Sequence, residues 1–193
     1  MKQIFYIIIL LCSNFPAVAQ NSTTFLKKVV SVCESGSREA SDLAMLREGA
    51  EKFNLPELAG LADIRENRSI DVQNRYSVEA ASALLDYAER HYGKESYEAV
   101  VCRRLLLSSL SPTDWDKAYQ VAVENTRCAD EMYRENSHDS SCRLLNLTVR
   151  LEQIMVEKLH DEDNPDHWEQ LFRIEKELEP YFSNEIEYTE ELV

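Results

Sequence analysis

Apolar residues recur along this chain at the spacing of one face of an α-helix. Three rows show the pattern, with Asn125 a polar interruption in the first: Ala118, Ala122, Ala129 and Met132; Leu144, Leu147, Leu151 and Ile154; and Leu171, Ile174, Leu178 and Tyr181. Such rows lie on one side of a helix and must be buried against another element. The 193 residues include only 4 Gly and 5 Pro, whereas an all-β fold needs turn residues every ~8–12 positions. The sequence therefore predicts an all-α fold.

Two segments of the second half resemble each other as helix starts. Ser111–Trp115 and Asn164–Trp168 both consist of a capping residue, a proline, two polar residues and a tryptophan. Ser or Asn accepts a backbone N–H bond at a helix N-terminus, and proline suits the first helical position. We therefore expect helices that begin at the two prolines. The two tryptophans, one turn into matching helices, are expected to be packed structurally rather than to stack on a ligand.

The helix ends are also duplicated. Tyr92–Ser96 and Tyr133–Ser137 lie 41 residues apart, and each has an aromatic residue, a short polar turn and a serine that can cap the next helix. Longer loops are tolerated in repeats, so an insertion between Ser137 and Trp168 does not break the pattern. The repeated unit is predicted to be an antiparallel helical hairpin.

These residues resemble a known family. The run Trp115-Asp116-Lys117-Ala118 looks like the start of the second helix in tetratricopeptide repeats, and the 41-residue period with the turn Tyr92–Ser96 resembles the kinesin-light-chain type. The resemblance covers about Tyr76 to Val193, although Arg134 replaces the turn glycine in the second copy. It implies hairpins stacked as a short right-handed α-solenoid of about three repeats. It also implies that the first helix of each hairpin lines a concave surface for partner peptides, as in secreted bacterial arrays of this type.

Three regions are expected along the chain: 1–19, 20–75 and 76–193. Residues 1–19 are similar to a secretory signal peptide, with basic Lys2, an apolar run over 4–12 and the small residues Ala17 and Ala19. The protein is therefore expected to be exported to a periplasmic or extracellular location. No later stretch is apolar enough to span a bilayer, so no membrane insertion is expected after cleavage.

The region 20–75 is expected to be a helical cap or a degenerate first repeat, because terminal repeats are usually atypical. Helices are predicted over 24–33, 41–53 and 56–67, with a break at Asn54-Leu55-Pro56. The region 76–193 would hold the tetratricopeptide-like repeats, beginning with a helix that leads into Tyr92.

The charge excludes some partners. The chain has 35 acidic and 21 basic residues and a net charge of −14, whereas nucleic acids and anionic membranes attract a positive surface. Four cysteines follow the signal peptide: Cys33, Cys102, Cys128 and Cys142. Each lies among apolar residues of a predicted helix, so we expect buried free thiols rather than disulfides.

No catalytic, cofactor or metal site is expected. The four glycines are isolated, so no phosphate-binding loop is formed, and no cysteine lies in a catalytic motif. His160 and His167 flank an acidic run, but this run lacks the central glycine and distal glutamate of an EF-hand, and a solvated loop is expected there.

A polar stripe on one predicted helix is the candidate partner-binding site. Arg143, Asn146 and Arg150 are spaced by three and four residues, opposite the leucines. The expected function is an exported protein–protein interaction module with no catalysis in these residues. The sequence does not identify its protein or peptide partner, but a concave face with arginines would favour acidic or C-terminal carboxylate peptides. An ordinary solvated helix face is the alternative for the stripe. The alternatives for the protein are the helical arm of a larger enzyme, such as a caspase-like protease, and a glycan-binding helical protein.

The last residues resemble the start of another repeat. Ser183 and Asn184 precede Glu185–Val193 at the position that Ser96 and Ser137 hold in earlier units. We therefore expect either a longer array or a terminal helix that needs a partner. The alternative is that this helix caps the array against Trp168 and Phe172.

Overall fold

The computed structural model describes residues 21–67, 70–110, 114–160 and 169–180, which form helices and turns without any strand. The helices are α2 (Asn21–Ser35), α3 (Ala40–Phe53), α4 (Pro56–Asn67), α5 (Ile70–Tyr92), α6 (Tyr97–Leu110), α7 (Trp115–Glu135) and α8 (Ser140–His160), followed by a helix over 169–180. The all-α prediction is confirmed for this part of the chain. The predicted signal peptide, Trp168 and the predicted terminal helix after Ser183 lie outside the described residues.

Local chemistry explains where α3 ends and α4 begins. Asn54 adopts a left-handed conformation with φ 55°, which asparagine tolerates at a helix C-terminus, and Leu55 N–H bonds the carbonyl of Ala50. Pro56 then begins α4 at the position where its missing N–H is not needed. The predicted break at 54–56 is therefore confirmed.

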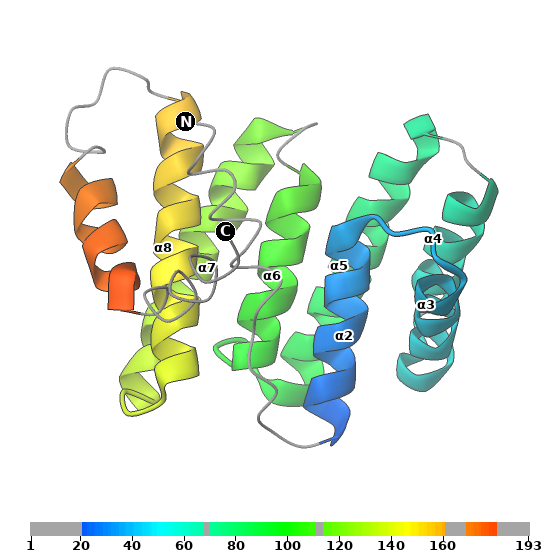
Figure 1. Cartoon of the computed structure of the whole chain (residues 1–193), viewed down its shortest axis with the longest axis horizontal. Helices are drawn as coiled ribbons and strands as arrows, with labels where there is room; N and C mark the ends of the chain where they lie inside the picture. Colours follow the sequence, from blue (N-terminus) through cyan, green and yellow to red (C-terminus); the bar gives the residue numbers. More distant parts are fainter. Residues whose placement is uncertain (1–20, 68–69, 111–113, 161–168, 181–193) are drawn as a thin grey trace, which may run out of the picture.

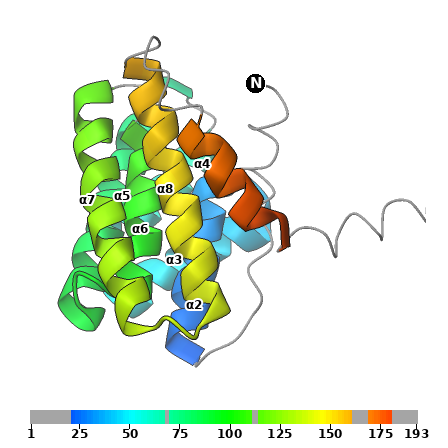
Figure 2. The same cartoon turned by 90° about the vertical axis from the view of Figure 1, so that its left-hand side faces the viewer.

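Each helix from α3 to α8 packs against the next one in the chain, and short turns make these neighbours antiparallel. The turns from α5 to α6 and from α7 to α8 lie at the same end, at the bottom of Figure 1. Helix α2 departs from this order, because it packs against α6 as well as α3. Figures 1 and 2 show α2, α6 and α8 running in the same direction, with α5 and α7 on one side of the molecule.

The apolar core follows this arrangement. Its largest cluster joins helices α2 to α6 through side chains such as Leu26, Val29, Leu46, Leu58, Leu61, Leu84 and Leu105. A second cluster lies between α6, α7 and α8, and a third joins α8 to the helix over 169–180. In this third cluster, Leu147, Leu151 and Ile154 of α8 pack with Leu171, Ile174 and Leu178, which confirms the apolar faces predicted from spacing.

The four described cysteines are buried and free. Burial raises the pKa of Cys33 to about 12 and that of Cys142 to about 11. Desolvation disfavours the charged thiolate, so these thiols remain protonated at neutral pH. The expectation that each packs as a small apolar residue is confirmed.

Two helix starts differ from the prediction, while a third agrees. Ser96 accepts the backbone N–H of Ala99 at 3.1 Å and caps α6 as expected. Helix α7, however, begins at Trp115 and not at Pro112, because Asp114 accepts the N–H of Lys117 at 3.2 Å. Helix α8 begins at Ser140, where Asp139 accepts the N–H of Ser141 at 2.8 Å. Aspartate caps as well as serine does, so the nearer aspartate defines each start.

Two further expectations are wrong in detail. Trp115 is 43% exposed. Its spacing places it on the same side of α7 as the buried Ala118 and Ala122, but it is the first residue of the helix and lies at its end. His160 was expected in a loop but is the last residue of α8, and residues 161–168 beyond it are outside the described part.

Close packing of α2 on α3 gives the first prediction. A Cβ at Gly49 would lie 3.1 Å from Val29 Cγ2 and 3.3 Å from Leu58 Cδ1, whereas Gly60 has nothing within 4 Å. We expect Gly49→Val to lower the free energy of unfolding by about 1–3 kcal/mol through overpacking. The control Gly60→Ala should raise it by about 0.5–1 kcal/mol, because alanine favours the helix. Urea denaturation measures both, and an unchanged Gly49→Val protein would contradict the packing.

Candidate functional site

The predicted stripe lies on α8, and each of its members contacts another part of the chain. Asn146 is buried and donates from Nδ2 to Asp130 Oδ1 at 2.7 Å. Arg150 donates to the same oxygen from Nε at 3.0 Å and from Nη2 at 2.8 Å. Arg143 pairs with Glu177, and its guanidinium lies 5.0 Å from the centroid of the Tyr133 ring. The stripe is brought together as predicted, but it faces α7 and the helix over 169–180.

These contacts change what the stripe offers a partner. Arg143, Asn146 and Arg150 line a hollow together with the carboxylates that hold them and with Leu147 and Ile174. An acidic peptide would have to compete with Asp130 and Glu177 for the two guanidinium groups. Asp130 and Glu177 therefore already neutralise the two guanidinium groups in this hollow.

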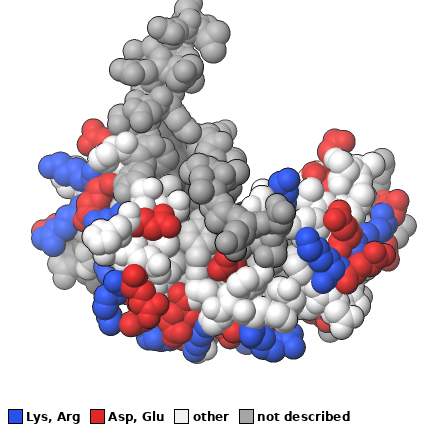
Figure 3. All heavy atoms as spheres, turned by 90° about the horizontal axis from the view of Figure 1, so that it is seen from below, with Lys and Arg blue, Asp and Glu red and all other residues white. Residues whose placement is uncertain are grey.

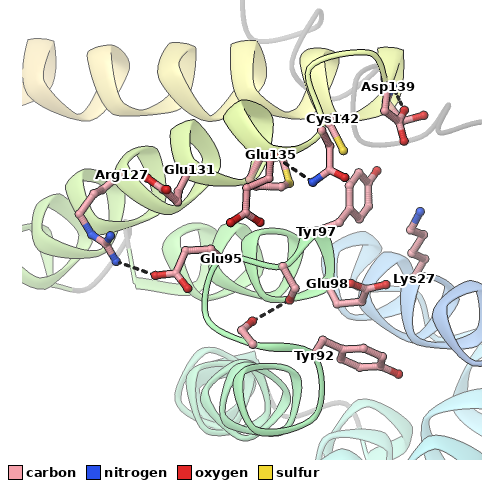
Figure 4. A pocket seen from close by; sticks show the side chains of 15 residues that line it. Lys27, Tyr92, Glu95, Tyr97, Glu98, Arg127, Glu131, Glu135, Asp139 and Cys142 are labelled. Carbon is pink, nitrogen blue, oxygen red and sulfur yellow. Dashed lines mark hydrogen bonds and ion pairs between the residues drawn. The ribbon is translucent and has the colours of Figure 1, made fainter.

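A larger hollow, of about 650 Å³, lies where the turns α5–α6 and α7–α8 meet the side of α2 (Figure 4). Charged groups dominate its lining, with five carboxylates and two cations: Glu95, Glu98, Glu131, Glu135, Asp139, Lys27 and Arg127. Tyr92, Tyr97 and Met132 contribute apolar surface. We call this feature the acidic hollow.

Some charges of the acidic hollow are paired within it. Arg127 contacts Glu95 at 3.3 Å, and it also contacts Glu124 at 3.1 Å. Glu131 pairs with Arg134 at 2.9 Å. Within the described residues, Glu98 and Glu135 form no ion pair. A net negative charge therefore remains at the hollow. Figure 3 views the molecule from the end where the turns α5–α6 and α7–α8 lie, and acidic and basic side chains are intermingled over that face.

Lys27 enters the acidic hollow from α2. Its Nζ lies 4.0 Å from the centroid of the Tyr97 ring, a distance at which a cation is attracted to the ring face. Partial burial lowers the pKa of Lys27, whereas the nearby carboxylates of Glu98 and Asp139 act to raise it. Burial also raises the pKa of Tyr97, so its phenol is neutral.

Sequence reasoning did not identify this hollow. The turns Tyr92–Ser96 and Tyr133–Ser137 were predicted, and both contain a basic residue followed by glutamate: Lys94-Glu95 and Arg134-Glu135. That repeated pair was a usable signal for charge at the helix ends. Lys27 is far away in sequence and becomes part of the site because α2 packs against α6.

Two adjacent buried arginines of α6 were also missed. Arg104 donates to Glu152 of α8 from Nε at 2.9 Å and from Nη2 at 2.5 Å, and both side chains are largely buried. Arg103 donates to Glu89 of α5 at 2.5 Å and to Asn125 of α7 at 3.2 Å. In the sequence, these two arginines are recognisable as a pair of charged residues within the apolar run Val100–Leu107.

A second carboxyl lies within electrostatic reach of Arg104. Glu34 of α2 is partly buried, and this burial raises its pKa to about 7, although Arg104 opposes the shift and Glu152 adds to it. Two carboxyls thus act on one guanidinium where α2, α6 and α8 come together. Glu34 is partly protonated at neutral pH as a result.

The buried cysteines are shifted away from the reactive thiolate form. In the described part of the chain no group of three or more His, Cys, Asp or Glu side chains is arranged to hold a metal ion. None of its helices combines the length and apolarity that a membrane span requires.

Comparison of the chain with protein-family models, with curated proteins and with solved structures gives no match.

The buried ion pair of α6 generates a prediction. Glu152→Gln removes the carboxylate to which the buried Arg104 donates, and we expect a loss of about 3 kcal/mol in the free energy of unfolding. The control Glu169→Gln removes the exposed partner of Arg173 and should change stability by less than about 0.5 kcal/mol. Equal effects of the two variants in urea denaturation would contradict the burial of the pair.

The raised pKa of Glu34 generates a second prediction. When a carboxyl has a raised pKa in the folded state, the free energy of unfolding falls as the pH rises from the unfolded-state pKa to the folded-state pKa, here from 4.5 to about 7. Glu34→Gln does not ionise, so its stability relative to wild type should increase by about 2 kcal/mol between pH 5 and pH 8. The exposed control Glu175→Gln should show no such trend. A Glu34→Gln effect that is the same at both pH values would show that the carboxyl ionises normally.

Proposed function

We propose that this chain is an exported protein–protein interaction module built from tetratricopeptide-like hairpins stacked as a right-handed solenoid, and that it binds a basic polypeptide segment in the acidic hollow. The observation that carries the proposal is the composition of this hollow, with five carboxylates against two cations. Export is proposed from the signal-peptide pattern of residues 1–19.

The packing of the second half supports stacked hairpins. Helices α6 and α8 run in the same direction (Figure 1) and are linked by Arg104 and Glu152, while α7 packs against both. This is the relation between equivalent helices of neighbouring repeats. The equivalent turns after α5 and α7 lie side by side at one end, where they line the acidic hollow.

The negative charge of the acidic hollow supports binding of a basic partner. A concave surface of one sign concentrates ligands of the opposite sign and increases their association rate. Glu98 and Glu135 are open to new ion pairs, and Tyr92 and Tyr97 offer apolar surface to the stems of lysine or arginine side chains. A basic segment would thus gain both charge pairing and apolar contact.

The polar stripe is a weaker candidate for partner binding. Arg143 and Arg150 already contact Glu177 and Asp130, so an acidic peptide would first have to break these pairs. Binding an acidic or C-terminal carboxylate peptide there remains the competing proposal, and the two proposals require peptides of opposite charge.

Peptides of opposite charge test the proposal. We expect a fluorescein-labelled peptide with four lysines to bind the protein, and its glutamate counterpart not to bind. The double variant Glu98→Gln/Glu135→Gln should bind the lysine peptide about fivefold more weakly, since each partly exposed ion pair contributes up to about 1 kcal/mol. Raising the salt concentration should weaken binding to wild type. Fluorescence anisotropy measures each dissociation constant.

Matched variants separate the two surfaces. Glu169→Gln/Glu175→Gln removes the same charge from the exposed side of the helix over 169–180 and should change binding less than twofold. Arg143→Gln/Arg150→Gln should also leave binding of the lysine peptide in place. Preferential binding of the glutamate peptide, lost in this last variant, would favour the stripe and contradict the acidic hollow.

A further inference from the structure

Lys27 alone comes from α2 among the residues that line the acidic hollow. Figure 4 shows its side chain extending beside the ring of Tyr97, with Glu98 on one side and Asp139 on the other. The ammonium group lies 4.0 Å from the ring centroid. An aromatic face flanked by carboxylates is the environment in which proteins hold cationic ligands.

The backbone that carries Lys27 is firmly held. The neighbouring residues Leu26, Val29 and Val30 are each at most 2% exposed and belong to the main core cluster. At the end of the helix, Arg65 donates to the carbonyls of Val32 at 2.8 Å and Cys33 at 2.7 Å. Helix α2 therefore stays in place, while the long Lys27 side chain can still rotate away from Tyr97.

We propose that Lys27 is a tethered, intramolecular occupant of the cation position formed by Tyr97, Glu98 and Asp139, and that a basic partner binds by displacing it. This inference rests on the proposed function, because Lys27 would compete with the basic partner for the same hollow. A side chain held on a rigid helix has a high effective concentration at its site, so it lowers the affinity for every cationic partner. Only a segment with several cations, which also reaches Glu135, would compete well.

The same lysine peptide tests this inference. We expect Lys27→Gln to bind it about three- to tenfold more tightly than wild type, which is the effect of removing one competing cation from an aromatic face. Lys27→Arg keeps the cation and should bind like wild type. Lys28→Gln is the matched control, because the adjacent Lys28 is exposed and the loss of charge is the same. It should change affinity by less than twofold.

A second measurement follows the side chain itself. The ε-methylene protons of a lysine above a tyrosine ring are shifted upfield by the ring current, and the Lys27 signal is identified by its absence in Lys27→Arg. We expect this upfield signal in the free protein, and we expect it to move to the position of the other lysines when the peptide saturates the hollow.

The outcomes distinguish the two proposals. If the peptide binds wild type, Lys27→Gln and Lys28→Gln equally and the Lys27 signal does not move, the displacement is wrong while the proposed function stands. If none of these proteins, including Lys27→Gln, binds the peptide, the proposed function fails and the displacement fails with it.

Discussion

The need to neutralise two buried guanidinium groups constrains the whole arrangement around α6. This helix packs against α5, α7, α2 and α8, and both Arg103 and Arg104 are at most 4% exposed. A buried charge is costly unless it is paired and hydrogen-bonded. Successive residues point about 100° apart around a helix, so the two arginines reach different neighbours. Arg103 links α6 to α5 and α7, and Arg104 links it to α8, so a shift of any one helix would leave a buried charge unpaired.

The same constraint accounts for the polar interruption in α7. Asn125 stands where the apolar row expects a small residue, and it is fully buried. Its Oδ1 accepts a bond from Arg103 Nη1 at 3.2 Å, so the departure from the repeat pattern provides a neutral partner for a buried cation. An alanine at this position would satisfy the pattern and remove that bond.

Local rules predicted the parts of the fold that depend on near neighbours in sequence. The buried rows of α7 and α8, the break at Asn54–Pro56 and the cap at Ser96 follow from helix periodicity and from capping chemistry. The candidate binding surfaces depend on contacts between residues that are far apart in the sequence, so they were predicted only in part. The spacing of Arg143, Asn146 and Arg150 placed them on one face but could not reveal that Asp130 and Glu177 face them. In a chain with 35 acidic and 21 basic residues, most arginines find a carboxylate, and the charges left over are acidic.

The position of α2 is the feature that periodicity could least predict, and two residues of this helix show how it is aligned. Lys27 and Glu34 are seven residues apart, which is two helical turns, and they lie on the same face of α2. Their partners on α6, Tyr97 and Arg104, are also seven residues apart and follow in the same order. The two helices therefore run parallel and in register, over about 10 Å between the two contacts. One end of this face enters the acidic hollow and the other reaches the buried charges of α6 and α8. Helix α2 thus lies beside α6 in the same direction, as α8 does, and it supplies Lys27, one of the two cations of the acidic hollow.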